Sequence, residues 1–167
     1  MDKRSVLLLV VVVVVVALAG SVGAACPSNQ LLPYGACVKL INMVETGDNR
    51  QNWEKSNEIC VKEGGQMISL DTPTKLEQFA AHVYNLPGDW SSYAHWVGAR
   101  KTGSSWSWLN DAELPINSNI WYPTAPEDNA NETYGFLAPY RDHQRFYLYS
   151  TDANGVFPVI ACEIEEY

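Results

Sequence analysis

Four cysteines and three histidines are the side chains of this protein best suited to covalent or metal chemistry. The cysteines stand at Cys26, Cys37, Cys60 and Cys162, and no two of them form a Cys-x-x-Cys pair. Zinc sites need closely spaced thiolates or imidazoles, whereas the histidines here lie far apart in the sequence. The cysteines therefore predict disulfide bonds, for which the sequence alone permits about three pairings.

The turn-forming run Pro33-Tyr34-Gly35 favours one of these pairings. It lies between Cys26 and Cys37 and can bring two short extended segments together, so a small hairpin closed by these cysteines is expected. That pairing would leave Cys60 with Cys162. The second bridge would close a loop of about a hundred residues and add roughly 4 to 5 kcal/mol of stability in the chain-entropy model.

The histidines, His82, His95 and His143, lack the partners that catalysis requires. A hydrolase needs a nucleophile beside a base, or two acids in a cleft, and the sequence contains no nucleophile-elbow or metal-binding motif. The histidines are therefore expected at the surface or as satisfied structural residues. The sequence predicts a binding protein rather than an enzyme.

The first residues have the pattern of a secretory signal peptide. Lys3 and Arg4 precede an unbroken apolar run over 6–19, and small residues at 22–25 offer a cleavage site. An uncleaved membrane anchor is the alternative, but the run is shorter than the roughly twenty residues that cross a bilayer. We expect a signal peptide over 1–25, a secreted, extracellular protein, and no membrane insertion.

Composition bounds the number of domains and the class of partner. Residues 26–167 fit one domain with a single core. The formal net charge of the whole sequence is −8. Nucleic acids and anionic membranes require a positive surface, so neither is an expected partner. The acidic balance is consistent with simple solubility or with a cation site.

Two helices are expected in the first half of this domain. The apolar spacing predicts a helix over 53–62, which Gly64-Gly65 ends in a left-handed turn. Thr72 can cap a second helix that starts at Pro73 and carries a core-facing stripe to about residue 85. No helix is expected beyond residue 88.

Strands dominate the rest of the expected structure, so the fold class is α+β. A bridge between Cys60 and Cys162 would make the first and last strands neighbours. The connection over 111–132 has little regular pattern, and long ordered loops are usually functional. The strands are expected at 38–44, 66–70, 96–99, 105–109, 135–137, 144–149 and 159–164.

Aromatic residues concentrate in the second half of the chain. Four of the six tryptophans lie between His95 and Trp121, which implies a compact core supporting one functional surface. A second cluster, over 140–149, mixes aromatic and basic side chains that could stack on sugar rings or meet a protein. The alternation of Phe146 and Leu148 with more polar neighbours favours a half-buried strand instead.

Several short motifs follow one another along the chain at a specific spacing. They are Cys60 before Gly64-Gly65, Trp96-Val97-Gly98, Trp106-Ser107-Trp108, Trp121-Tyr122-Pro123 followed by Pro126, and Ala161-Cys162-Glu163. In this order and spacing, the motifs make the chain resemble a C-type lectin-like domain. The resemblance covers 26–167 and implies that fold: two helices, antiparallel sheets and a long irregular loop region. Cys26 and Cys37 are similar to the extra amino-terminal pair of the family's long form, as in single-domain secreted invertebrate lectins.

The resemblance implies a Ca²⁺ ion in the long loop. Sugar-binding members use a Glu-Pro-Asn or Gln-Pro-Asp triplet with a cis peptide bond before its proline, a later Glu, and an Asn-Asp pair on a strand. Sugar hydroxyls complete the coordination shell of the ion, which has about six to eight oxygen ligands. Here the triplet is Ala125-Pro126-Glu127, which lacks the first ligand, and Ser150-Thr151-Asp152 stands where Trp-Asn-Asp is expected. Glu127-Asp128-Asn129 is an alternative triplet one position later.

The resemblance assigns two overlapping sets of residues to this loop region. Because some of the family's metal ligands are missing here, the resemblance leaves open whether the chain binds Ca²⁺. The implied carbohydrate-binding residues are Glu127, Asp128, Asn129, Glu132 and Asp152, and the implied metal ligands are Glu127, Glu132 and Asp152.

The same loop carries a glycosylation sequon and lacks a family disulfide. Asn131-Glu132-Thr133 makes Asn131 a glycosylation acceptor, and a glycan there would crowd the ion site. Tyr134 and roughly Asn154 occupy the places of the family's second core cysteine pair. The loop therefore lacks a covalent clamp, and greater mobility is expected.

By this resemblance the chain is expected to be a secreted lectin that recognises cell-surface or microbial glycans in innate defence. Its partners would be glycans or glycoproteins, bound with Ca²⁺ if the reduced ligand set still holds the ion. Affinity for a single sugar should be weak, so several copies, for example in a homo-oligomer, would supply avidity. The alternative is a Ca²⁺-independent module of the same fold that binds a protein or another surface.

Overall fold

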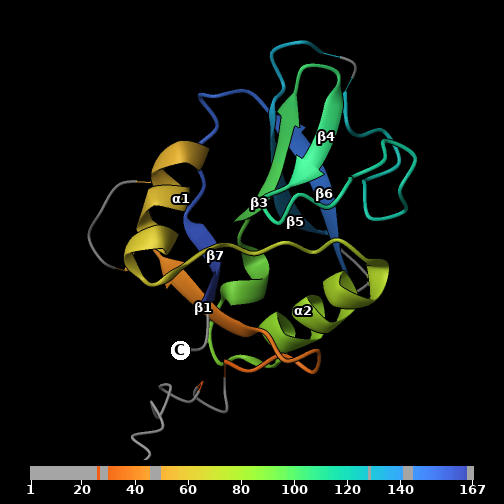
Figure 1. Ribbon diagram of the computed structural model, residues 1–167. Coiled ribbons are helices and arrows are strands. Elements are labelled where there is room, and N and C mark those ends of the chain that lie inside the picture. Colours follow the sequence, from red (N-terminus) through yellow and green to blue (C-terminus); the bar gives the residue numbers. More distant parts are fainter. Residues whose placement is uncertain (1–25, 27–29, 46–49, 128, 141–144, 165–167) are drawn as a thin grey trace, which may run out of the picture.

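The computed structural model describes residues 26, 30–45, 50–127, 129–140 and 145–164 (Figure 1). The predicted signal peptide over 1–25, His143 and Asp128 lie outside these residues. None of the helices in the described part of the chain combines the length and the apolar character needed to span a membrane.

Two α-helices form where the sequence predicts them. Helix α1 spans Trp53–Lys62, and the side chain of Asn52 caps it by accepting a hydrogen bond of 3.0 Å from the Lys55 amide. Helix α2 spans Pro73–Asn85, and Thr72 caps it in the same way. The buried face of α2 is the predicted apolar stripe, made of Leu76, Phe79, Ala80 and Val83.

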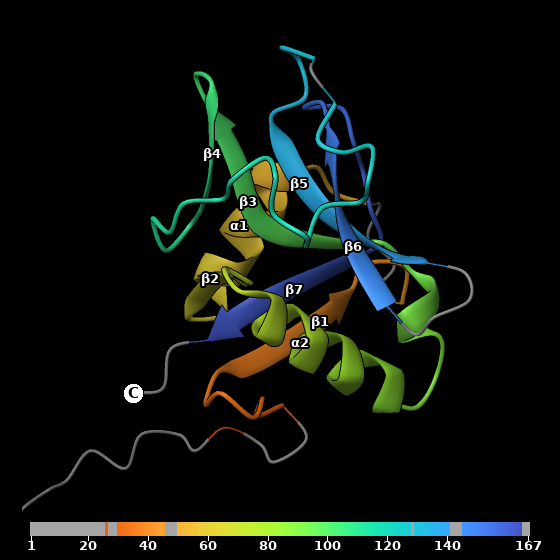
Figure 2. The same ribbon diagram turned by 90° about the vertical axis from the view of Figure 1, so that its right-hand side faces the viewer.

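The described strands form one mixed 7-stranded sheet, with β1, β7, β3, β5 and β6 in that spatial order (Figure 2). Strand β2 pairs with β7, and β4 pairs with β3. The first and last strands, β1 and β7, pair antiparallel, which confirms the prediction that they are neighbours. The strands are β1 Cys37–Asn42, β2 Gly65–Met67, β3 His95–Thr102, β4 Ser105–Trp108, β5 Tyr134–Tyr140, β6 Arg145–Thr151 and β7 Val159–Ile164.

The structure differs from the sequence-based expectation in several details, among them the shorter β2, which ends at Met67, and the longer β3, which ends at Thr102. Strands β3 and β7 pair in parallel, so the sheet is mixed rather than purely antiparallel. Strands β5 and β6 are longer than predicted because they pair with each other along their whole length. A short 3₁₀ helix, η1, spans Trp90–Ser92 in the half of the chain where no helix was expected.

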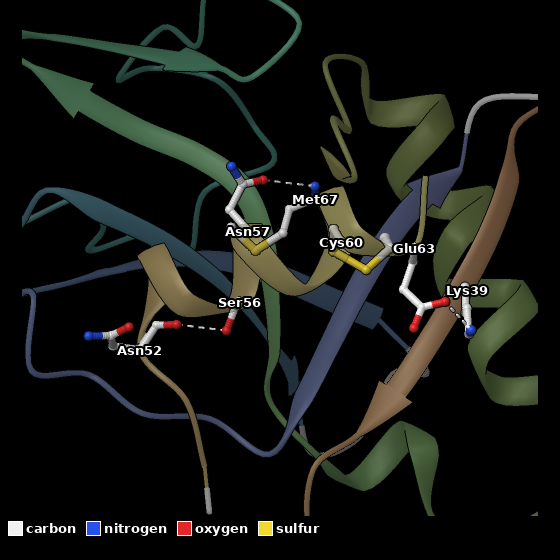
Figure 3. The surroundings of a disulfide bond; sticks show 8 residues. Lys39, Asn52, Ser56, Asn57, Cys60, Glu63 and Met67 are labelled. Carbon is white, nitrogen blue, oxygen red and sulfur yellow. Dashed lines mark hydrogen bonds and ion pairs between the residues drawn. A yellow bond between two sulfur atoms is a disulfide. The ribbon is translucent and has the colours of Figure 1, made fainter. Parts of the chain in front are cut away.

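Both predicted disulfide bonds are present. Cys26 pairs with Cys37, and Cys60 pairs with Cys162, with Cα–Cα distances of 5.6 and 5.3 Å. Figure 3 shows the second bridge joining α1 to β7. Nearby, Asn57 on α1 accepts a 3.3 Å hydrogen bond from the Met67 amide, so α1 is fixed to the sheet by covalent and polar contacts.

The core explains the tryptophan-rich motifs. Trp96 and Trp108 are fully buried, and Trp106 packs edge-on against Trp121 with ring centroids 5.0 Å apart. A β-carbon at Gly98 would lie 2.7 Å from the Met67 carbonyl oxygen, so only glycine lets β3 approach that segment. In Figures 1 and 2 the long loop projects from one end of this core, away from β1 and the end of β7.

Candidate functional site

The long loop between β4 and β5 is anchored to β6. The Leu148 amide donates to the Ile120 carbonyl, and the Tyr122 amide donates to the Leu148 carbonyl, both at 2.9 Å. The Trp121 indole donates to the Pro115 carbonyl at 3.1 Å. These bonds hold the middle of the loop as an extra edge beside β6, so its position is set by backbone pairing rather than by its own propensity.

The peptide bond between Ala125 and Pro126 is cis, as the resemblance implies. After it, the Glu127 amide donates to the Ser150 hydroxyl at 3.1 Å. That hydroxyl in turn donates to the carboxylate of Glu132. The structure therefore brings Glu127 and Glu132 together around Ser150 of β6, a residue that the sequence motifs did not single out as a ligand.

The other predicted site residues are engaged in local turns. Both carboxylate oxygens of Asp152 accept hydrogen bonds from Asn154, at 2.9 Å from its amide and 3.3 Å from its side chain. The side chain of Asn129 accepts a 3.0 Å hydrogen bond from the Asn131 amide. Asn131, the predicted glycosylation acceptor, is exposed. The carboxylate of Asp152 thus binds within its own turn. The residue of β6 that contacts the triplet Ala125-Pro126-Glu127 is Ser150.

The described residues fit a Ca²⁺ ion poorly. The ion takes about six to eight oxygen ligands. Ala125 supplies no side-chain oxygen, the carboxylate of Glu132 accepts from Ser150, and that of Asp152 accepts from Asn154. Over 26, 30–45, 50–127, 129–140 and 145–164, no group of three or more His, Cys, Asp or Glu side chains is placed to hold a metal.

Tyr134 stands where the family has a cysteine and makes a different set of contacts. Its ring stacks on Trp53 of α1 with centroids 4.9 Å apart, and its hydroxyl hydrogen-bonds the carboxylate of Glu54. This hydrogen bond, with burial, raises the pKa of the Tyr134 phenol. The end of the long loop is therefore tied to α1 by an aromatic stack and a hydrogen bond.

The outward face of β6 carries a cluster of tyrosines. Its inward residues Phe146 and Leu148 are fully buried, which confirms the predicted alternation. On the other face, Tyr149 stacks on Tyr122 of the long loop with centroids 4.9 Å apart, and Tyr147 lies 5.7 Å from Tyr122. We call Tyr122, Tyr140, Tyr147 and Tyr149 the tyrosine face.

The packing of the tyrosine face changes the pKa of Tyr149. Burial raises the pKa of Tyr149, and the neighbouring phenols of Tyr122, Tyr140 and Tyr147 raise it further because like charges repel. The sequence pattern indicates the aromatic cluster that contains Tyr140, Tyr147 and Tyr149, but not Tyr122, which lies in a segment without strand periodicity. Only the pairing of the loop with β6 places it against Tyr149.

Two hollows lie on either side of the start of β6. The first, about 380 Å³, is lined by the long loop, which includes Tyr122, and by Arg145 and Tyr147 of β6; we call it the loop groove. The second, about 400 Å³, lies between α2 and β6 and includes Leu76, Ala80 and Phe146. Arg145, the first residue of β6, lines both.

Comparison with known families identifies the class of protein. The Lectin C-type domain matches residues 49–160, and the chain belongs to this family. Proteins of the family are non-enzymatic, which confirms the prediction that the chain is not an enzyme.

A curated relative is the rat C-type lectin domain family 9 member A, 28% identical over 126 residues, which are 75% of this chain and 46% of that protein. The chain spans about half the length of the curated relatives it matches.

Two solved structures share the fold at low sequence identity. The C-type lectin domain of murine dendritic cell inhibitory receptor 2, in complex with N-glycan, is 15% identical, with a TM-score of 0.65 over 85% of this chain and 100% of that one. A calcium-independent type II antifreeze protein is 19% identical, with a TM-score of 0.60 over 86% of this chain and 96% of that one. At these identities the likeness establishes the fold alone.

Proposed function

We propose that the chain is a secreted glycan-binding protein that binds sugars at its long-loop end without requiring Ca²⁺. The observation that carries the proposal is the link from Glu127 through Ser150 to Glu132, which fixes the loop against β6 beside the tyrosine face. An ordered loop flanked by aromatic rings is a suitable surface for sugars. The N-glycan complex of the related murine domain supports this class of ligand.

The donor set supports independence from Ca²⁺. Ala125, at the first position of the triplet, has no side-chain oxygen, and both carboxylate oxygens of Asp152 already accept hydrogen bonds from Asn154. A sugar bound here would instead rely on direct hydrogen bonds and on stacking against aromatic rings. Such contacts are individually weak, so several linked copies, for example in a homo-oligomer, would be needed for useful avidity.

The biological setting that we propose is extracellular recognition of microbial or other cell-surface glycans in innate defence. The signal-peptide pattern and the two disulfide bonds favour secretion. Expression of the full chain in a secreting cell should give protein in the medium that begins near Cys26. A mass decrease on glycosidase treatment would establish modification of Asn131; an unchanged mass would exclude it.

A glycan array probed with the secreted protein tests the main proposal. We expect binding to a subset of glycans in the presence of EDTA, and loss of binding on competition with the free sugar. Asp152→Ala should leave this binding unchanged, because the carboxylate is engaged with Asn154. Loss of binding in EDTA, restored by millimolar Ca²⁺, would contradict the proposed independence from Ca²⁺. The chain would still be a glycan-binding protein.

The second candidate is a Ca²⁺-independent module that binds a protein or another surface. The reduced ligand set favours it, and a calcium-independent antifreeze protein shares the fold. A complete absence of glycan binding, with and without Ca²⁺, would exclude the lectin proposal and leave this candidate. Capture of one protein partner, unaffected by any free sugar, would then be the positive result.

A further inference from the structure

The loop groove has three kinds of lining in one hollow. Tyr122 and Tyr147 are aromatic residues of the lining, and Asn117 and Asn119 are residues with amide side chains. Arg145 contributes a positive charge. Its volume of about 380 Å³ lies at the lower end of small-molecule sites, about 300–1,000 Å³, so it suits one or two sugar rings.

Arg145 is held across this groove. Its guanidinium carbon lies 4.5 Å from the ring centroid of Tyr147. One of its nitrogens donates to the Asn119 carbonyl at 3.5 Å. The guanidinium thus contacts both Tyr147 and Asn119, and its planar fork matches the two oxygens of a carboxylate.

We propose that the loop groove binds a sugar that carries a carboxylate, such as a uronic or a sialic acid. The inference rests on the proposed glycan-binding function and names its ligand class. The carboxylate pairs with Arg145, a C–H face of the sugar ring lies on Tyr122 or Tyr147, and sugar hydroxyls bond to the amides of Asn117 and Asn119. A carboxylate is favoured over a neutral sugar because Arg145 lines this hollow and, among the described residues, no Asp or Glu does.

The hollow between α2 and β6 is the competing location. It shares Arg145, but Glu77 also lines it, and the negative charge of that carboxylate would repel an acidic sugar. Ala81 lines this hollow only and is exposed, so Ala81→Trp fills it without altering the loop groove.

The experiment compares acidic sugars with their own methyl esters. The probes are the methyl glycosides of glucuronic acid and of N-acetylneuraminic acid, each as free carboxylate and as carboxyl methyl ester, titrated into the secreted chain by NMR. We expect the carboxylates to bind about tenfold more tightly than the esters at low salt, since charge-assisted hydrogen bonds are the stronger ones. Added salt should narrow the difference.

Substitutions then locate the carboxylate. Arg145→Gln should remove the preference for the carboxylate, and Arg145→Lys should keep part of it. Arg100→Gln is the matched control, because Arg100 is exposed on β3 and lines neither hollow. Tyr147→Ser should weaken binding of both acid and ester. Circular dichroism confirms that each variant is folded.

Three results would overturn the inference. These are equal binding of acid and ester by the unmodified chain, an equal loss in Arg100→Gln and Arg145→Gln, and loss of binding in Ala81→Trp. If neutral glycans bind on the array while the acidic probes do not, the groove assignment fails and the glycan-binding function stands. If no glycan binds at all, the proposed function itself fails.

Discussion

The buried imidazole of His95 should make the stability of the fold depend on pH. Its side chain is 0% exposed and packs edge-on against Phe79 and Phe146, with ring centroids 6.0 and 5.2 Å away. Neither ring nitrogen makes a hydrogen bond of acceptable geometry to another described residue, and the backbone of Tyr93 offsets burial only in part. Burial lowers the pKa of His95 from 6.5 to about 3.

The sign and size of the effect follow from proton linkage. As the pH falls through 6.5, the imidazole of the unfolded chain takes up a proton, while the folded one stays neutral until about pH 3. The free energy of unfolding therefore decreases by about 1.4 kcal/mol per pH unit below 6.5. Between pH 7.5 and pH 5, His95 alone should cost about 2 kcal/mol of stability.

Urea unfolding followed by tryptophan fluorescence measures this cost in the wild type and in His95→Phe. Burial also raises the pKa of Glu163, whose protonation acts in the opposite direction, but that contribution is common to both proteins and cancels in the difference. His95→Leu is a second variant, because a fixed packing penalty in either variant does not change with pH. His82→Asn, on the half-buried side of α2, is the control and should retain most of the wild-type pH dependence.

The expected result is a difference in pH dependence of about 2 kcal/mol between wild type and both His95 variants over that range. If all three proteins lose stability equally from pH 7.5 to pH 5, within about 0.5 kcal/mol, the burial argument is wrong. The imidazole would then be protonated in the folded state or accessible to solvent.

Three further predictions test the scaffold and the loop. Replacing Cys60 and Cys162 together by serine should lower the free energy of unfolding by about 4–5 kcal/mol in urea, because the bridge spans 102 residues; a loss below about 1 kcal/mol would contradict the loop-entropy estimate. Thr72→Ala should lower the free energy of unfolding by about 1 kcal/mol, because the Thr72 hydroxyl caps α2 by accepting a hydrogen bond of 3.2 Å from the Lys75 amide. Urea unfolding measures this loss, and Thr72→Ser should retain most of the wild-type stability. Ser150→Ala should speed hydrogen exchange of the Glu127 amide, which donates to the Ser150 hydroxyl. An unchanged exchange rate would show that this hydrogen bond does not order the loop.

Much of the scaffold could be predicted because it depends on short-range patterns. The bounds of α1 and the start of α2 follow from a cap, a helical apolar period and a stop signal, each contained within a few neighbouring residues. The alternation of Phe146 and Leu148 likewise depends only on the two-residue period of a strand. Both disulfide pairings follow from a turn between two cysteines, which leaves the other two to pair.

The site was harder to predict because it depends on the register of separate segments. The motif pointed to Asp152, whereas the residue beside Glu127 and Glu132 is Ser150, two positions earlier on the chain. A shift of this kind changes which side chain faces a neighbour, and no local pattern records it. The parallel pairing of β3 with β7 is also not recorded by any local pattern, because it depends on the path of the chain between the two strands.

The sequence by itself determined the two α-helices and favoured the disulfide pairing through residues at short spacing, and a family motif implied the class of fold and the cis peptide bond before Pro126. Only the tertiary structure decided that Tyr122 meets Tyr149, that Arg145 reaches Asn119, and that a groove lies between them. These contacts join a loop without periodicity to a strand that follows it. Backbone pairing of the two segments, rather than the identity of any residue, sets which side chains share that surface.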